Sequence, residues 1–208
     1  MIESTAITAI FDGVTARVHA NGSPLRTLAV TSTLHKEGTT TVALGIALSL
    51  AAFDSSTEVL LIDANWLHPS LTEDAGRSAV PGLAECLRDG FPVTRGVMRT
   101  ARRSLSFLPA GQSGSEPPPL GRLAAILEEA RKSFAKIVID LSPVMVAPSL
   151  VVPWANAVDQ SYLVLRRAVT PVTLIRRAMA EVGAERPPQL ILNRTRDRAG
   201  DWGPFRVG

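Results

Sequence analysis

The sequence predicts an α/β fold, in which helices flank both faces of a parallel twisted sheet to make a three-layer α/β/α domain. Short apolar runs alternate with helical patterns along most of the chain. The runs are nearly continuous, as is typical of parallel strands that are covered on both faces. Of the 208 residues, 46% are hydrophobic and 20% are charged, which is enough for one domain with a real core and excludes a disordered chain.

The predicted elements follow a strand, loop, helix, strand order that is typical of parallel β-α-β units. We expect strands at Leu25–Thr31, Glu58–Asp63, Ser104–Leu108, Lys136–Leu141, Tyr162–Leu165 and Gln189–Asn193. We expect helices at Thr39–Phe53, Gly82–Leu87, Leu120–Phe134 and Pro171–Val182. The segment Gly111–Pro119 is rich in Gly, Ser and Pro, and this composition predicts a flexible loop.

Three segments are predicted along the chain. Residues 1–24 form a weakly amphipathic helical extension, residues 25–194 form the α/β domain, and residues 195–208 form a polar tail that we expect to be flexible. The pattern of residues 1–24 does not resemble a signal peptide, and no apolar stretch is long enough to cross a bilayer, which needs about 20 residues. We therefore expect a cytoplasmic location, with any membrane attachment supplied by a partner.

Charge and cysteine content narrow the class of protein further. The net charge is only +3, but arginines cluster at positions 99–103, 166–167, 176–177 and 194–198. Such clusters suit phosphate, acidic proteins or anionic lipid, and equally an ordinary solvated surface. Cys86 is the single cysteine, so no intramolecular disulfide can form, and no Cys/His grouping has the spacing of a metal site.

The loop between the first predicted strand and helix is a candidate phosphate-binding loop. It reads T-S-T-L-H-K-E-G-T-T-T-V-A from Thr31 to Ala43. Backbone N–H groups at such a strand-to-helix turn attract anions, and a working loop ends in Gly-Lys-Ser/Thr. Here Thr40 supplies the hydroxyl that would hold Mg²⁺, but Thr39 replaces the lysine. The alternative interpretation is an ordinary turn that contains a glycine.

Two aspartates end apolar strands downstream of this loop. Asp63 closes V-L-L-I-D and Asp140 closes I-V-I-D. A carboxylate at such a strand end can hold a Mg²⁺ ion or act on an attacking group. One such residue is weak evidence, because strand ends are often polar, but two in this order after the loop are stronger. We therefore take Asp63 and Asp140 as candidate catalytic residues and, with Thr40, as candidate Mg²⁺ ligands.

Six ordered motifs together resemble the bacterial tyrosine kinase (BY-kinase) family, a group related to MinD/ParA-like deviant P-loop proteins. The resemblance covers about residues 25–193, through the loop Ser32–Ala43, L-I-D-A-N-W-L-H-P at Leu61–Pro69, Pro81–Leu83, Leu108–Gly111, Val138–Pro143 and Leu192–Arg194. It implies a P-loop NTPase-like fold and a site for ATP or ADP with Mg²⁺. The nucleotide-binding residues that it implies are Lys36, Glu37, Gly38, Thr39, Thr40, Thr41 and, near the adenine, Asn193.

The departures from the family pattern all fall on its catalytic parts. Besides Thr39 in place of lysine, Lys36 stands where the family has glycine, and Asn65 stands where the second motif has its second aspartate. The usual tyrosine-rich tail is missing, since Tyr162 is the single tyrosine. Loss of a group that neutralises a transferring phosphate costs several kcal/mol of transition-state stabilisation. We do not expect efficient kinase activity, and we expect nucleotide binding to be weak or absent.

These observations leave three hypotheses. The first is a pseudokinase that regulates exopolysaccharide or capsule polymerisation or export by binding a membrane-anchored co-polymerase, alone or as a homo-oligomer. The second is a residual ATPase or protein-tyrosine kinase that uses Lys36 in place of the missing lysine. The third is a MinD/ParA-like positioning ATPase, which is weakened because Leu34 occupies the position where such proteins carry an early loop lysine. None of the three predicts a nucleic-acid partner.

Overall fold

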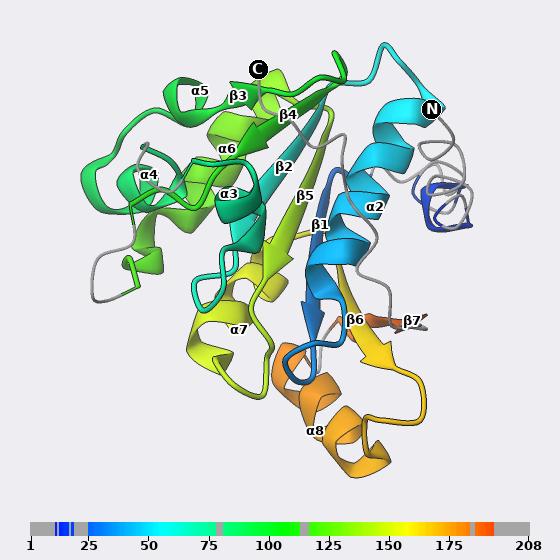
Figure 1. Cartoon of the computed structure of the whole chain (residues 1–208). Coiled ribbons are helices and arrows are strands. Elements are labelled where there is room, and N and C mark those ends of the chain that lie inside the picture. Colours follow the sequence, from blue (N-terminus) through cyan, green and yellow to red (C-terminus); the bar gives the residue numbers. More distant parts are fainter. Residues whose placement is uncertain are drawn as a thin grey trace.

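The computed structural model shows a seven-stranded sheet between two layers of helices (Figure 1). It describes residues 11, 13–16, 18, 25–77, 81–112, 117–183 and 186–193. The strand order is β3-β4-β2-β5-β1-β6-β7. The strands are β1 Thr27–Ser32, β2 Val59–Ala64, β3 Met98–Arg99, β4 Leu105–Leu108, β5 Lys136–Leu141, β6 Gln160–Arg166 and β7 Gln189–Asn193.

The predicted α/β class is confirmed, with one correction to the sheet. All neighbouring strands pair in parallel except β3, which pairs antiparallel with β4 through Met98 opposite Phe107 and Arg99 opposite Ser106. Sequence patterns missed β3 because two residues are too short for any periodicity. The sheet is therefore mixed, with an antiparallel strand at one edge.

The helices of the described chain are α2 Thr39–Phe53, α3 Ser70–Asp74, α4 Leu83–Asp89, α5 Val93–Gly96, α6 Leu123–Ser133, α7 Pro148–Ala157 and α8 Val172–Val182, with a 3-10 turn η1 at Leu120–Arg122. Sequence patterns did not predict α3, α5 and α7. The helix α7 escaped it because Pro148 begins the helix and Pro153 lies inside it. Proline is favourable in a first helical turn but breaks a helical pattern elsewhere.

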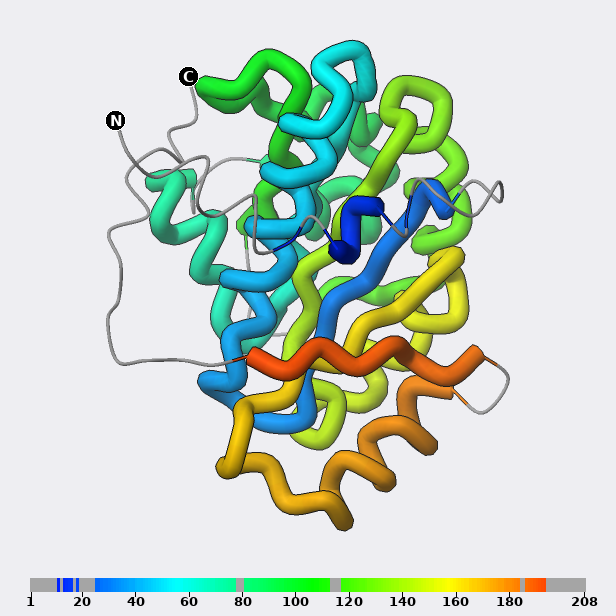
Figure 2. The backbone as a smooth tube through the Cα atoms, turned by 90° about the vertical axis from the view of Figure 1, so that its right-hand side faces the viewer, coloured from blue at the N-terminus to red at the C-terminus, as the bar shows by residue number. Residues whose placement is uncertain are grey.

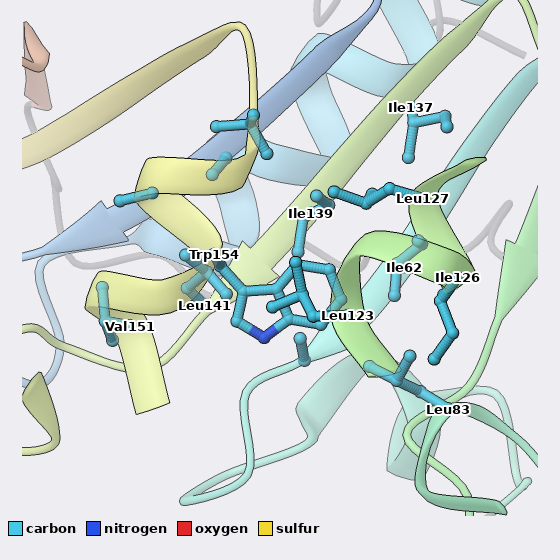
Figure 3. Packing of buried hydrophobic residues seen from close by; sticks show 14 of the residues in the cluster. Ile62, Leu83, Leu123, Ile126, Leu127, Ile137, Ile139, Leu141, Val151 and Trp154 are labelled. Atoms are coloured by element: carbon cyan, nitrogen blue, oxygen red, sulfur yellow. The ribbon is translucent and has the colours of Figure 1, made fainter. Parts of the chain in front are cut away.

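The two helical layers bury two separate apolar clusters against the sheet. On one face, α2 packs over the sheet together with Phe11 and Val18 of the helical residues near the N-terminus. On the other face, α4, α6, α7 and α8 contribute to a second cluster that includes the fully buried Trp154 of α7. Figure 3 shows Trp154 next to Leu123 of α6. The helix α2 is buried along most of its length, and this burial explains why its sequence is apolar on almost all sides.

The helical residues near the N-terminus lie along α2, beside the β7 side of the sheet (Figure 2). The hydroxyl of Thr15 donates a 2.8 Å hydrogen bond to the hydroxyl of Ser49. The predicted boundaries at residues 24 and 194 remain predictions, because neither residue is among those that the structure describes. The predicted tail at residues 195–208 also lies outside the described residues. Within the predicted loop Gly111–Pro119, the described residues have no regular structure, as expected.

Candidate functional site

A cavity of about 500 Å³ opens where β1 leads into α2. Its lining combines the loop before α2 and the first turn of that helix with residues that follow β2 and β5. Because the carboxyl ends of parallel strands meet at one edge of the sheet, three segments far apart in sequence converge here. Of the predicted binding residues, the lining includes Lys36, Gly38, Thr39, Thr40 and Thr41.

The first turn of α2 faces this cavity without a capping side chain. Gly38 is the N-cap residue, with φ of 95°, and it makes no side-chain hydrogen bond to the helix. No acidic residue lies in the first turn. The first N–H groups of a helix lack partners within the helix and carry partial positive charge, so they bind anions. The turn is therefore suited to a phosphate group.

Thr39 occupies the lysine position of the loop and is nearly buried, with 7% of its surface exposed. It lines the cavity with a neutral side chain. Lys36 lies at the mouth, where it is exposed, and its backbone has φ of 63°. This left-handed conformation is the one that glycine favours. The lysine in the place of glycine therefore keeps the glycine-like backbone shape of the loop.

Glu37 braces the loop from inside instead of lining the cavity. Its Oε2 atom accepts hydrogen bonds from the backbone N–H groups of Thr33 at 2.8 Å and Leu34 at 2.9 Å. Its Oε1 atom accepts a hydrogen bond from the hydroxyl of Thr170. The side chain of Asn193 donates to the Glu37 carbonyl at 3.0 Å, so β7 also supports the loop. Both predicted binding residues therefore hold the shape of the loop.

Thr40 and Asp140 meet beneath the cavity. The Thr40 hydroxyl donates a 2.7 Å hydrogen bond to Oδ2 of Asp140. The other carboxylate oxygen, Oδ1, is buried and has no hydrogen-bond partner within the described structure. Burial raises the pKa of Asp140 well above its usual value, and the neighbouring Asp63 charge raises this pKa further. A hydroxyl beside an unpartnered carboxylate oxygen suits Mg²⁺, which takes hard oxygen ligands.

Asp63 lies directly opposite Asp140 between β2 and β5, but its carboxylate is already engaged elsewhere. Its Oδ2 atom accepts hydrogen bonds from the backbone N–H and the hydroxyl of Thr72, at 2.9 and 2.7 Å. Its Oδ1 atom accepts one from the N–H of Asn65 at 3.2 Å. Burial raises the pKa of Asp63 to about 6 despite these bonds. This geometry favours a structural role for Asp63, in which it holds α3 to the end of β2.

Asn65, which the sequence resemblance aligns with an aspartate, lies beside the cavity and is held by neutral groups. Its Oδ1 atom accepts a 2.9 Å hydrogen bond from the hydroxyl of Ser142 and a 3.3 Å bond from the N–H of His68. An aspartate at this position would place a third buried carboxylate near Asp63 and Asp140. The asparagine therefore fixes the loop after β2 without adding a charge.

Two histidines that sequence reasoning passed over also line the cavity. The rings of His35 and His68 lie edge to face, with their centroids 5.2 Å apart and an interplanar angle of 75°. Both residues are exposed at the mouth. The one available signal was that they follow β1 and β2, the two strands that we expected to form one parallel β-α-β unit. Within the described residues, no group of three His, Cys, Asp or Glu side chains could hold a metal ion by itself.

Two curated proteins are similar to this chain in sequence. The succinoglycan biosynthesis transport protein ExoP of Rhizobium meliloti is 32% identical over 164 residues, which are 74% of this chain. The match spans only 20% of the length of ExoP. The tyrosine-protein kinase CpsD of Streptococcus agalactiae is 25% identical over 205 residues, which cover 93% of this chain and 84% of CpsD. No family model matches the chain.

A solved kinase domain has the same architecture. The VpsO kinase domain superposes with a TM-score of 0.81 and 25% identity, and the match covers 94% of this chain and 97% of that domain. The chain belongs to the bacterial tyrosine kinase family. Its BY-kinase domain also has the fold of the MinD cell division protein from Aquifex aeolicus, with a TM-score of 0.62 at 21% identity over 82% of this chain and 70% of that chain.

The BY-kinase fold accounts for the convergence of the sequence motifs at one edge of the sheet. The loop motif, the Asp63 motif and the Asp140 motif follow β1, β2 and β5, which are neighbours or next neighbours. Among the described helices of this BY-kinase domain, none combines the length and the apolar character that a bilayer crossing requires.

Proposed function

We propose that this chain is a catalytically impaired BY-kinase-like protein that regulates exopolysaccharide or capsule polymerisation or export through a membrane-anchored partner. Membership of the BY-kinase family and the name of ExoP, a succinoglycan biosynthesis transport protein, support the polysaccharide context. We place the protein in the cytoplasm, where the partner recruits it to the membrane. In this proposal the domain keeps its ability to bind a partner, while its ability to transfer a phosphoryl group is reduced.

The observation that carries the proposal is Thr39. At the position from which a lysine neutralises the transferring phosphate, the cavity wall presents a neutral, nearly buried side chain. Removal of one electrostatic group that stabilises developing charge lowers the rate by about 10²–10³-fold. The carboxylate of Asp63, the second candidate catalytic group, is engaged by Thr72. Both features reduce catalysis while they leave the domain intact.

The residues at the cavity still suit a phosphate-bearing ligand with Mg²⁺. The first turn of α2 would hold phosphate through its N–H groups, and Thr40 with Asp140 would hold the metal ion. Bound Mg²⁺ would neutralise charge on the phosphates. We therefore propose weak binding of Mg·ATP or Mg·ADP, which changes the state of the loop and not the covalent state of a tyrosine.

Calorimetric titration of Mg·ATP into the purified chain tests this proposal. We expect weak binding by the wild type and at least about tenfold tighter binding by Thr39→Lys, because one added phosphate contact of about 1.4 kcal/mol has that effect. Thr39→Met is the matched control, since it adds a side chain of similar length without charge. Equal affinities of the lysine and methionine variants would contradict the account of Thr39.

A phosphotransfer assay separates the pseudokinase from a residual enzyme. Lys36 lines the cavity, and this observation favours the second candidate function, an ATPase or kinase that uses it. With γ-labelled ATP and a tyrosine-containing polymer, we expect no transfer by the wild type. If the wild type transfers phosphate and Lys36→Ala does not, the protein is a residual enzyme and not a pseudokinase.

Cell fractionation tests whether a membrane-anchored partner recruits this chain to the membrane. We expect the chain to sediment with membranes from cells that contain the co-polymerase and to remain in the supernatant after its deletion. Purified chain mixed with protein-free anionic vesicles is the control, and we expect no binding there. Direct binding to these vesicles would contradict recruitment by a protein partner.

A further inference from the structure

The mouth of the cavity beside α2 carries three basic side chains from two separate loops. His35 and Lys36 precede α2, and His68 follows β2. Among the residues that the structure describes, no carboxylate lines this cavity. The lining therefore combines basic groups and hydroxyl groups with the N-terminal turn of a 15-residue helix, all of which favour an anion.

The arrangement of the two histidines brings their charges together when both rings are protonated. The ring centroids are 5.2 Å apart, so two imidazolium ions would repel one another. An anion at the cavity mouth removes this repulsion and gains two positive neighbours. Histidine is the residue whose ordinary pKa of about 6.5 places this charge change close to neutral pH.

We infer that His35 and His68, with Lys36, recognise the phosphate groups of the ligand in place of a lysine at position 39. This inference rests on the proposed binding of a nucleotide at the cavity and adds the residues that select its charge. It predicts a site whose affinity for phosphate depends on the protonation of two histidines. A loop lysine at position 39 would stay charged throughout the physiological range.

The acidic groups near the histidines do not compete for them in this structure. Glu37 turns its carboxylate to the backbone of the loop, and Asp140 lies beneath Thr40. Asp63 is held by Thr72. On α3, Glu73 and Asp74 are exposed and are not part of the lining. In the described structure Lys36 has no ion-pair partner, so the three basic groups are available to a ligand.

Two measurements on the full chain test the inference. The first follows the NMR signals of the histidine rings as sodium sulfate, which stays a dianion at both pH values, is added at pH 6.0 and at pH 8.0. An anion that binds beside protonated rings must bind more tightly at the lower pH, because proton and anion binding are linked equilibria. The second is calorimetry with Mg·ATP at pH 6.0 and pH 8.0, on the wild type and on the double variant His35→Gln/His68→Gln.

We expect sulfate to move the ring signals of both histidines and Mg·ATP to bind about tenfold more tightly at pH 6.0 than at pH 8.0, since two exposed charge pairs contribute modestly. The double variant should lose this pH dependence while its circular dichroism stays unchanged. Lys132→Gln, an exposed lysine on α6 that is not part of the lining, controls for net charge and should behave as the wild type.

Two outcomes would overturn the inference and are distinguishable. Equal Mg·ATP binding at both pH values, in the wild type and the double variant, would remove the histidines from recognition and leave nucleotide binding intact. The absence of any binding of Mg·ATP or sulfate at either pH would overturn both the inference and the proposed nucleotide binding.

Discussion

Asp63 and Asp140 face one another across β2 and β5 as partners in register, and both are fully buried. Asp63 shares its oxygens among hydrogen bonds from Thr72 and Asn65, whereas Asp140 receives a single bond from Thr40. Two neighbouring carboxyl groups in a buried setting do not ionise independently. The pair therefore couples the stability of the folded protein to pH. Asp140, which has fewer hydrogen bonds, is the carboxyl group whose ionisation is the more costly of the two.

Replacement of Asp140 by asparagine should stabilise the protein at high pH. Burial raises the pKa of both carboxyl groups in the folded state, so the contribution of this pair to stability is greatest at low pH and falls as pH rises through the folded-state pKa values, about 6 for Asp63. We expect the unfolding free energy of Asp140→Asn to exceed that of the wild type at pH 8, where the wild type has to keep a charged carboxylate buried. Urea unfolding at pH 4.5, 6 and 8 should show this difference shrinking toward low pH.

Asp159 provides a control of opposite sign. Burial alone would raise the pKa of Asp159, but hydrogen bonds from Thr27 and Arg26 and the charge of Arg131 hold this pKa below its usual value. Its contribution to stability is present above about pH 4 and is lost as pH falls. Asp159→Asn should therefore destabilise the protein at neutral pH. If Asp140→Asn lowered stability at pH 8 as well, the coupled pair would not behave as described.

Loss of the Glu37 carboxylate should loosen the phosphate loop. Glu37→Ala leaves the N–H groups of Thr33 and Leu34 without their acceptor, which costs about 2–3 kcal/mol of unfolding free energy. Hydrogen exchange of these two amides should accelerate in the variant. Glu128→Ala, which removes an exposed carboxylate paired with Arg131, should cost less than about 0.5 kcal/mol. Unchanged protection at Thr33 and Leu34 would show that the brace is dispensable.

Lys36→Gly should stabilise the fold while it removes a basic side chain. The residue has φ of 63°, a conformation that costs a non-glycine residue about 1–2 kcal/mol. Glycine relieves this strain, but it also gives the unfolded chain more backbone freedom, which offsets part of the effect. We therefore expect a net increase of about 0.5 kcal/mol in the unfolding free energy, measured by thermal or urea unfolding. Ala168→Gly, at φ of 59°, should change stability in the same direction. Lys36→Ala is the control, because alanine keeps the strain, and a gain of equal size there would contradict this explanation.

Gly45→Ala should detach the helical residues near the N-terminus from α2. A Cβ atom at Gly45 would overlap the ring of Phe11, which is buried. We expect a loss of about 1–3 kcal/mol in unfolding free energy, as is usual for overpacking. Since both residues form one contact, the double variant with Phe11→Ala should lose less than the sum of the single losses.

Gly121→Ala is the matched control for Gly45, because a Cβ atom there meets nothing within 4 Å. We expect its unfolding free energy to stay close to that of the wild type. Additive losses for Gly45→Ala and Phe11→Ala would indicate that the ring and the glycine act separately.

The sequence predicted the central strands because their apolar runs are short and continuous. It located β1, β2 and β5 to within one or two residues, and it placed α2 at its observed bounds. It could not predict β3 or α5, since segments of two to four residues carry no periodicity. It also missed α7, whose two prolines interrupt the helical pattern although the buried Trp154 anchors that helix in the core.

The sequence by itself determined the strand-helix order, the apolar core and the neutral residue at position 39, because these depend on residue type and local spacing. The tertiary structure decided which distant residues meet. The strand order places Asp63 beside Asp140 and brings His35 to His68, and side-chain hydrogen bonds direct Glu37 and Asp63 away from the cavity. Such choices depend on sheet register and on competition among nearby donors, which act only once the chain is folded.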